Sequence, residues 1–310
     1  MRRQMSYPTT LYAVAWVIVF AGCGGSNYNG GGVPGESRDL AFSWSGPDDG
    51  GVTAIDAGAP DLVVSSSCPE SAKLVYVVDE NNMFSSFKPD LLQFIDIGTL
   101  NCPARRGATP FSMAIDRTAV AWVLYSSGEI FKVDTTNAKC TGTPYSPGQR
   151  GFDQFGMGFA ANAQGSNDET LYIAGPRGFF GGGGLGAIDT RSLVVTRIAN
   201  LGGSPELTGT GSGTLWGFFP EGAMPRVAQI DKSQGTESNV FSLHKLAGTP
   251  RAWAFAFWGG DFWIFLKRVT DGSTRVWQLR QTGELTTAIG DSQRTIVGAA
   301  VSTCAPIGIQ

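Results

Sequence analysis

Val120-Ala121-Trp122-Val123 is a short apolar segment with an aromatic residue at its third position, and segments of this kind recur along the chain. Four further aromatic residues take the same place in such segments: Tyr76, Tyr172, Trp216 and Trp263. Successive aromatics of the series lie 46, 50, 44 and 47 positions apart. A repeat of this length, made of short strands and glycine-rich turns, is typical of β-propeller blades. We expect these aromatic residues to lie in the core.

The unit around Trp122 divides into four predicted strands, at about 111–116, 119–125, 129–134 and 138–143. The unit around Trp216 divides in the same way, at 206–210, 214–219, 226–231 and 239–243. The first unit has no room for an innermost strand, whereas residues 295–303 form a strand without a partner at the end of the chain. Pairing this strand with the first unit leaves no open edge where the ring closes. The predicted fold is therefore an all-β, five-bladed β-propeller of four-stranded blades over residues 68–310, with its first blade closed by the C-terminal strand.

This topology predicts two disulfides. Cys304 follows the closing strand and Cys68 precedes the second strand of the same blade, so both lie where other blades have a connecting hairpin. We therefore expect a Cys68–Cys304 bridge and, by elimination, a Cys102–Cys140 bridge. Their Cα atoms must then lie within about 7 Å of each other.

The N-terminus predicts export and a lipid anchor. Two arginines precede an apolar run at 11–21 that is too short to span a bilayer, as in a secretory signal peptide over residues 1–22. Cys23 directly after Ala21-Gly22 resembles a bacterial lipobox, which implies lipidation of Cys23, with palmitate among the acyl chains. An odd number of cysteines in an exported protein needs an explanation, and lipidation of one of the five supplies it. The alternative is an ordinary cleaved signal with a free cysteine nearby, and Phe20 departs from the usual aliphatic residue.

Residues 23–67 are rich in glycine, proline and aspartate and show no apolar period, so we expect a flexible tether after the lipidated cysteine. The predicted location is the cell envelope, at the periplasmic face or the outer surface of the outer membrane. The repeats resemble bacterial extracytoplasmic β-propellers of the NHL and quinoprotein-like types over residues 68–304. The resemblance implies architecture only, because no motif carries over catalytic residues.

Composition excludes several functions. The formal charge is −3, and no block of lysine or arginine stands out, so nucleic acid is not an expected partner. The only histidine is His244, at an expected surface position, and no two cysteines have zinc-ligand spacing. We therefore predict no metal and no cofactor, and we expect a monomer.

Few acidic residues fall on the predicted innermost strands. Asp116 and Glu206 are the two candidates for acid–base catalysis on a carbohydrate in the central channel. Three other acids, Asp134, Asp189 and Asp231, recur at one position of the blades and are expected to cap turns. The sequence thus supplies a weak basis for a hydrolase or lyase.

Exposed aromatic residues offer weak candidates for binding. Arg177, Phe179 and Phe180 lie in a long glycine-rich turn, and Trp258 lies at a turn in the last unit. Packing between blades is the alternative role for them. The favoured interpretation is a membrane-anchored lipoprotein whose propeller binds an envelope protein or a glycan without chemistry. The alternative is an extracytoplasmic carbohydrate-active hydrolase or lyase, and at least three carboxylates converging on the channel would favour it over a channel lined by Gly, Ala and Ser.

Overall fold

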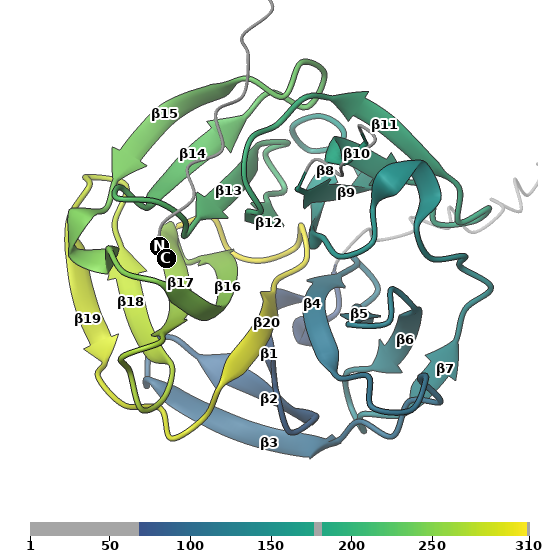
Figure 1. Cartoon of the computed structure of the whole chain (residues 1–310), viewed down its shortest axis with the longest axis horizontal. Coiled ribbons are helices and arrows are strands. Elements are labelled where there is room, and N and C mark those ends of the chain that lie inside the picture. The colour runs from purple at the N-terminus through teal and green to yellow at the C-terminus, as the bar shows by residue number, and fades with distance from the viewer. Residues whose placement is uncertain (1–67, 177–181, 309–310) are drawn as a thin grey trace, which may run out of the picture. The chain divides into compact units, whose positions relative to one another are not determined.

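Twenty strands form five antiparallel sheets of four in the computed structural model, which describes residues 68–176 and 182–308. The sheets are arranged as blades around a common centre (Figure 1). The all-β, five-bladed propeller is therefore confirmed. The predicted signal peptide, Cys23, the predicted tether and the loop residues Arg177, Phe179 and Phe180 lie outside the described residues.

Each blade runs from an innermost to an outermost strand. Blade one contains β20 (Ile296–Ala300), β1 (Val75–Asp79), β2 (Met83–Lys88) and β3 (Gln93–Thr99). Blade two contains β4 (Pro110–Ile115), β5 (Val120–Tyr125), β6 (Ile130–Asp134) and β7 (Cys140–Gly142). Blade three contains β8 (Gly156–Ala161), β9 (Glu169–Gly175), β10 (Gly184–Ile188) and β11 (Val195–Ala199).

The remaining blades follow the same order. Blade four contains β12 (Glu206–Gly209), β13 (Leu215–Phe219), β14 (Arg226–Ile230) and β15 (Glu237–Ser242). Blade five contains β16 (Pro250–Trp258), β17 (Asp261–Arg268), β18 (Arg275–Leu279) and β19 (Leu285–Ile289). Three short 3-10 helices complete the described residues: η1 (Glu70–Lys73), η2 (Gln149–Gly151) and η3 (His244–Leu246).

The C-terminal strand closes the ring as predicted. β20 pairs antiparallel with β1, with Tyr76 opposite Ala300 and Val77 opposite Ala299, and it lies beside β1 in Figure 1. Both predicted disulfides are present: the Cα atoms are 5.9 Å apart in Cys68–Cys304 and 5.0 Å apart in Cys102–Cys140. The closing bridge joins segments that are 236 positions apart.

The repeated aromatic residues lie in the second strand of every blade, and each pairs with a small or short residue of the innermost strand. The inner partners of Tyr76, Trp122, Tyr172, Trp216 and Trp263 are Ala300, Ala114, Gly158, Thr208 and Ala256. A small partner leaves room for the large ring between neighbouring blades. Four of the rings are buried as predicted, but Trp216 is only partly buried, against Phe241 and Phe262.

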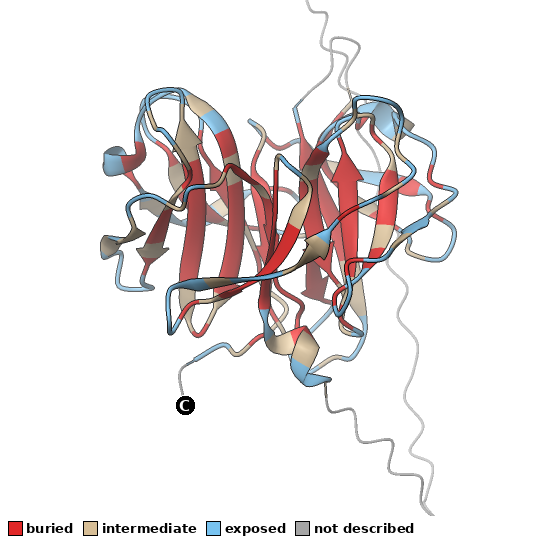
Figure 2. Ribbon diagram, turned by 90° about the horizontal axis from the view of Figure 1, so that it is seen from below, coloured by how far each residue is buried: buried red, intermediate tan, exposed pale blue. Residues whose placement is uncertain are grey.

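Glycines let the innermost strands approach one another near the axis, where the blades converge. A Cβ on Gly156 would lie 2.1 Å from the Pro205 carbonyl oxygen, and one on Gly209 would lie 2.2 Å from that of Phe159. Blades three and four therefore meet backbone to backbone at the centre. Figure 2 shows long buried stretches along the strands and largely exposed connecting turns at the two ends. Outermost strands such as β3 and β15 are mostly intermediate or exposed.

Candidate functional site

The beginnings of four innermost strands surround a cavity of about 460 Å³ at one end of the channel. We call it the entrance cavity, and its lining includes Phe111 of β4, Glu206 of β12, Arg251 and Trp253 of β16, and the turn residues Glu80 and Asn81. Its volume falls within the range of about 300–1,000 Å³ that is usual for small-molecule sites.

Glu206 is the first residue of β12 and is only 3% exposed. Its Oε2 accepts a hydrogen bond of 2.8 Å from Ser112 Oγ on β4, and that hydroxyl accepts one of 3.2 Å from the Met157 amide on β8. Burial raises the pKa of Glu206 well above its ordinary value of 4.5, while the bonds from Ser112 and the Met157 backbone oppose this rise. The carboxyl group therefore keeps its proton to a higher pH than an exposed glutamate does.

Two aromatic side chains line the entrance cavity from the blades on either side of β20. Trp253 donates from Nε1 to the Ser204 carbonyl oxygen at 3.2 Å and packs against the core cluster around Phe255 and Phe257. Phe111 packs against the core cluster that contains Phe155 and Met157. These contacts fix both rings before any ligand arrives, so their remaining partly exposed faces form a rigid apolar part of the lining.

Polar side chains also line the entrance cavity. Glu80 and Arg251 carry opposite formal charges, and Arg251 is exposed. Within residues 68–176 and 182–308, neither the Asn81 side chain nor the Arg251 guanidinium makes a hydrogen bond to another side chain or to the backbone. The entrance cavity thus combines apolar faces with donors and acceptors that a ligand can use.

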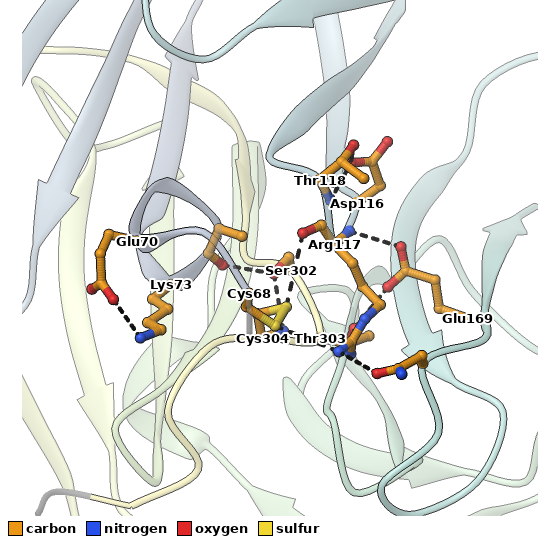
Figure 3. Close-up of a disulfide and its surroundings, with 12 residues drawn as sticks. Cys68, Glu70, Lys73, Asp116, Arg117, Thr118, Glu169, Ser302, Thr303 and Cys304 are labelled. Atoms are coloured by element: carbon orange, nitrogen blue, oxygen red, sulfur yellow. Dashed lines mark hydrogen bonds and ion pairs between the residues drawn. A yellow bond between two sulfur atoms is a disulfide. The ribbon is translucent and has the colours of Figure 1, made fainter. Parts of the chain in front are cut away.

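Asp116, the other acid of the predicted pair, lies at the opposite end of the channel. Its Oδ1 accepts hydrogen bonds from the amides of Thr118 and Val120 at 2.9 and 3.0 Å, and its Oδ2 accepts one from Trp122 Nε1 at 3.0 Å. Figure 3 shows Asp116 beside Thr118. Ser112 contacts Glu206, and Asp116 comes four residues after Ser112 along the strand. In extended backbone, four residues separate the two Cα atoms by about 13 Å. The structure therefore does not bring Asp116 and Glu206 together, and Asp116 caps the turn that leads into β5.

A polar network at this second end surrounds the closing disulfide, and no motif in the sequence predicts it. Glu169 accepts hydrogen bonds from the Arg117 amide at 2.8 Å and from Thr303 Oγ1 at 2.7 Å, and Arg117 Nη1 donates to Thr303 Oγ1 at 3.0 Å (Figure 3). Burial is the main influence on Glu169 and raises its pKa. Because these residues come from blades two and three and the segment after β20, the network stabilises ring closure.

Trp258 is the last residue of β16 and is partly buried. Its Nε1 donates to the Lys73 carbonyl oxygen at 2.8 Å, which ties blade five to the segment before β1. It lines a second cavity, of about 630 Å³, together with Trp263 and the Pro89–Leu92 turn. Trp258 therefore has a structural contact, and any binding role for it is separate from the entrance cavity.

The three recurring aspartates cap turns as expected. Asp134, Asp189 and Asp231 each accept a hydrogen bond from the backbone amide two residues later, and these bonds contribute to a lowered pKa of each carboxyl group. His244 begins η3 and is exposed. In the described part of the chain, no group of three or more His, Cys, Asp or Glu side chains is arranged to hold a metal ion. Over the same residues, no helix is long and apolar enough to cross a membrane.

Comparison with known proteins shows likeness in architecture only. No model of a protein family matches the sequence, and no curated protein matches it. A chain of a nidogen/laminin complex has 7% identity and a TM-score of 0.47, with coverage of 73% of this chain and 97% of that one. A protein of unknown function from Bacteroides caccae has 10% identity and a TM-score of 0.44, with the same coverage. A chain of hydrazine synthase from Kuenenia stuttgartiensis has 12% identity and a TM-score of 0.39, with coverage of 69% and 65%. Since every TM-score is below 0.5, nothing about function is taken from these chains.

Proposed function

We propose that this protein is a lipid-anchored envelope protein whose propeller binds a glycan or another envelope protein at the channel entrance without chemical change. The observation that carries the proposal is the make-up of the entrance cavity: fixed aromatic faces, polar groups around them, and one deeply buried acid. Cys23 supplies the anchor in this proposal, and residues 24–67 supply the tether.

A hydrolase or lyase is the second candidate, and one observation favours it. Glu206 has a raised pKa, as a general acid requires, and Glu80 places a second carboxyl group at the same cavity. The pair would be Glu206 with Glu80 rather than with Asp116. We favour binding because Ser112 already engages one oxygen of Glu206, and the lining of the entrance cavity, among the described residues, includes no third carboxylate.

Photo-crosslinking in the producing cells tests the proposed binding face. A photoreactive amino acid replaces the exposed Thr109, which lines the entrance cavity, or, as the matched control, the exposed Leu91 in the turn between β2 and β3 at the other end. We expect adducts from position 109 and none from position 91. Adducts formed from position 91 alone would contradict the proposal.

A parallel assay separates binding from catalysis. The full chain is incubated with an array of envelope glycans, and mass spectrometry measures any sugar that is released. The proposal expects retention without release. Release that is lost in both Glu206→Gln and Glu80→Gln, and kept in the exposed control Glu284→Gln, would establish the hydrolase or lyase instead.

A further inference from the structure

We propose that the entrance cavity binds the terminal pyranose ring of an uncharged glycan, an inference that rests on the proposed binding function and names its ligand. The entrance cavity lies at the start of β20, between the strands that carry Phe111 and Trp253. It contains both kinds of surface that a pyranose needs. The apolar C–H face of the ring packs on an aromatic side chain, and its hydroxyl groups need paired donors and acceptors.

The aromatic contribution comes from Trp253. Its indole N–H already donates to the Ser204 carbonyl oxygen, so what the ring offers to the cavity is apolar surface rather than a hydrogen-bond donor. Phe111, on the far side of β20, supplies a second apolar surface. Because packing against the blade cores holds both rings, a sugar meets surfaces that need not reorganise on binding, which reduces the entropic cost.

The polar contribution comes from groups that can donate and accept. The Asn81 amide does both, and so does the Glu206 carboxyl group in the protonated form that its burial favours; each can pair with a hydroxyl that also donates and accepts. Arg251 adds donors at the exposed side of the cavity. These groups suit several neighbouring hydroxyls, which a sugar offers and an aliphatic or aromatic ligand does not.

Charge selects an uncharged sugar. The formal charges of Glu80 and Arg251 cancel, and a protonated Glu206 adds none. A ligand carboxylate would be repelled by the carboxylate of Glu80, and a ligand ammonium would be repelled by the guanidinium of Arg251. Burying a charge without a partner is unfavourable, so the cavity favours a ligand without one.

Titration calorimetry of the full chain with methyl pyranosides tests the inference. Neutral glucosides, galactosides and mannosides are compared with a glucuronide and a glucosaminide of the same ring size. We expect at least one neutral pyranoside to bind, and Trp253→Ala to weaken it by about tenfold, as loss of an aromatic contact does. Glu206→Gln, which keeps a donor and an acceptor, should retain binding, whereas Arg251→Ala, at an exposed position with no risk to folding, should weaken it.

Three results would overturn the inference: tighter binding of the charged sugars, binding by none of the pyranosides, or unchanged binding in both Trp253→Ala and Arg251→Ala. Val269→Ala, at an exposed turn position, is the control for unspecific effects, and circular dichroism confirms that each variant is folded. If no pyranoside binds but position 109 still crosslinks to a protein, the ligand class is wrong and the proposed binding function remains. If position 109 forms no adduct either, both fail.

Discussion

At the scale of single residues, Glu206 sets the chemistry of the channel. Its carboxyl group lies where three inner strands meet, contacted by Ser112 of β4 and the Met157 amide of β8. No salt bridge to it occurs within the described residues. An unpaired buried carboxylate is costly, and the group avoids this cost by remaining protonated. Its stability contribution must therefore depend on pH.

The substitution Glu206→Gln should change how stability depends on pH. In the wild type, the unfolded chain releases this proton near pH 4.5 while the folded protein keeps it, so the free energy of unfolding falls as pH rises from there to the folded pKa. Glutamine does not titrate and escapes this loss, which amounts to about 1.4 kcal/mol for each unit of pKa elevation. Urea unfolding at pH 4 and pH 8 measures it. Parallel profiles for wild type and variant would contradict the expectation, and Glu284→Gln, at an exposed position, should match the wild type.

Gly156 should not tolerate even one added carbon. Its alanine Cβ would lie 2.1 Å from the Pro205 carbonyl oxygen and 2.8 Å from the Glu206 Cα, so blades three and four would have to separate at the axis. Overpacking of this kind costs about 1–3 kcal/mol. The matched control is Gly142→Ala in the outer strand β7, where an added Cβ meets nothing within 4 Å. Thermal melting of both variants measures the difference, and equal melting temperatures would show that the inner strands are not closely packed.

At the scale of elements, the ranges of the strands were predictable to about two residues, whereas the bulges within them were not. The strands of blade two match their expected ranges within two residues, because short apolar runs there are separated by polar turns. In blade four, β15 begins at Glu237 rather than at 239. Its pairing with β14 shifts register between Val227 and Gln229, opposite Asn239 with its φ of 47°. A bulge interrupts the alternation that marks a strand in sequence.

The candidate site was only partly predictable, for a related reason. Glu206 could be identified because an acid on an inner strand is unusual in this chain. Trp253 and Arg251 were not identified as site residues, because the order of residues does not say which side chains at the beginning of β16 face the entrance cavity. The sequence suggests Asp116 and Glu206 as a catalytic pair only because both fall on predicted innermost strands. Asp116 in fact follows the end of β4, whereas Glu206 begins β12, so the two acids lie at opposite ends of the channel.

The closing disulfide should stabilise the fold more than the second one does. Cys68–Cys304 spans 236 positions and Cys102–Cys140 spans 38. By the loop-entropy relation, the two contribute about 5 and about 4 kcal/mol, because the longer loop loses more freedom in the unfolded chain. We expect the double variant Cys68→Ser/Cys304→Ser to unfold at lower urea than Cys102→Ser/Cys140→Ser. The reverse order would mean that strand pairing and the Arg117–Glu169–Thr303 network hold the ring closed without the bridge.

At the scale of the whole molecule, the two ends of the channel differ: one carries the entrance cavity, and the other carries the closing disulfide. The entrance cavity is formed where inner strands begin. Cys68, to which the predicted tether connects, is bonded to Cys304 after the end of β20, at the opposite end. Residues 23–67 therefore join the propeller, at Cys68, at the end of the channel away from the entrance cavity.

The anchor itself is tested by Cys23→Ser. Four of the five cysteines are paired in two disulfides, which leaves Cys23 as the one available for an acyl chain. We expect the wild type in the membrane fraction and Cys23→Ser in the soluble fraction, with equal melting temperatures because the change lies 45 positions before the first residue of the propeller. Ser26→Ala, which leaves Cys23 in place, should stay with the membranes. A Cys23→Ser protein that remained in the membrane fraction would contradict the lipid anchor. Cys23 would then be an unmodified thiol next to an ordinary signal peptide, and membrane attachment would have to come from a bound partner.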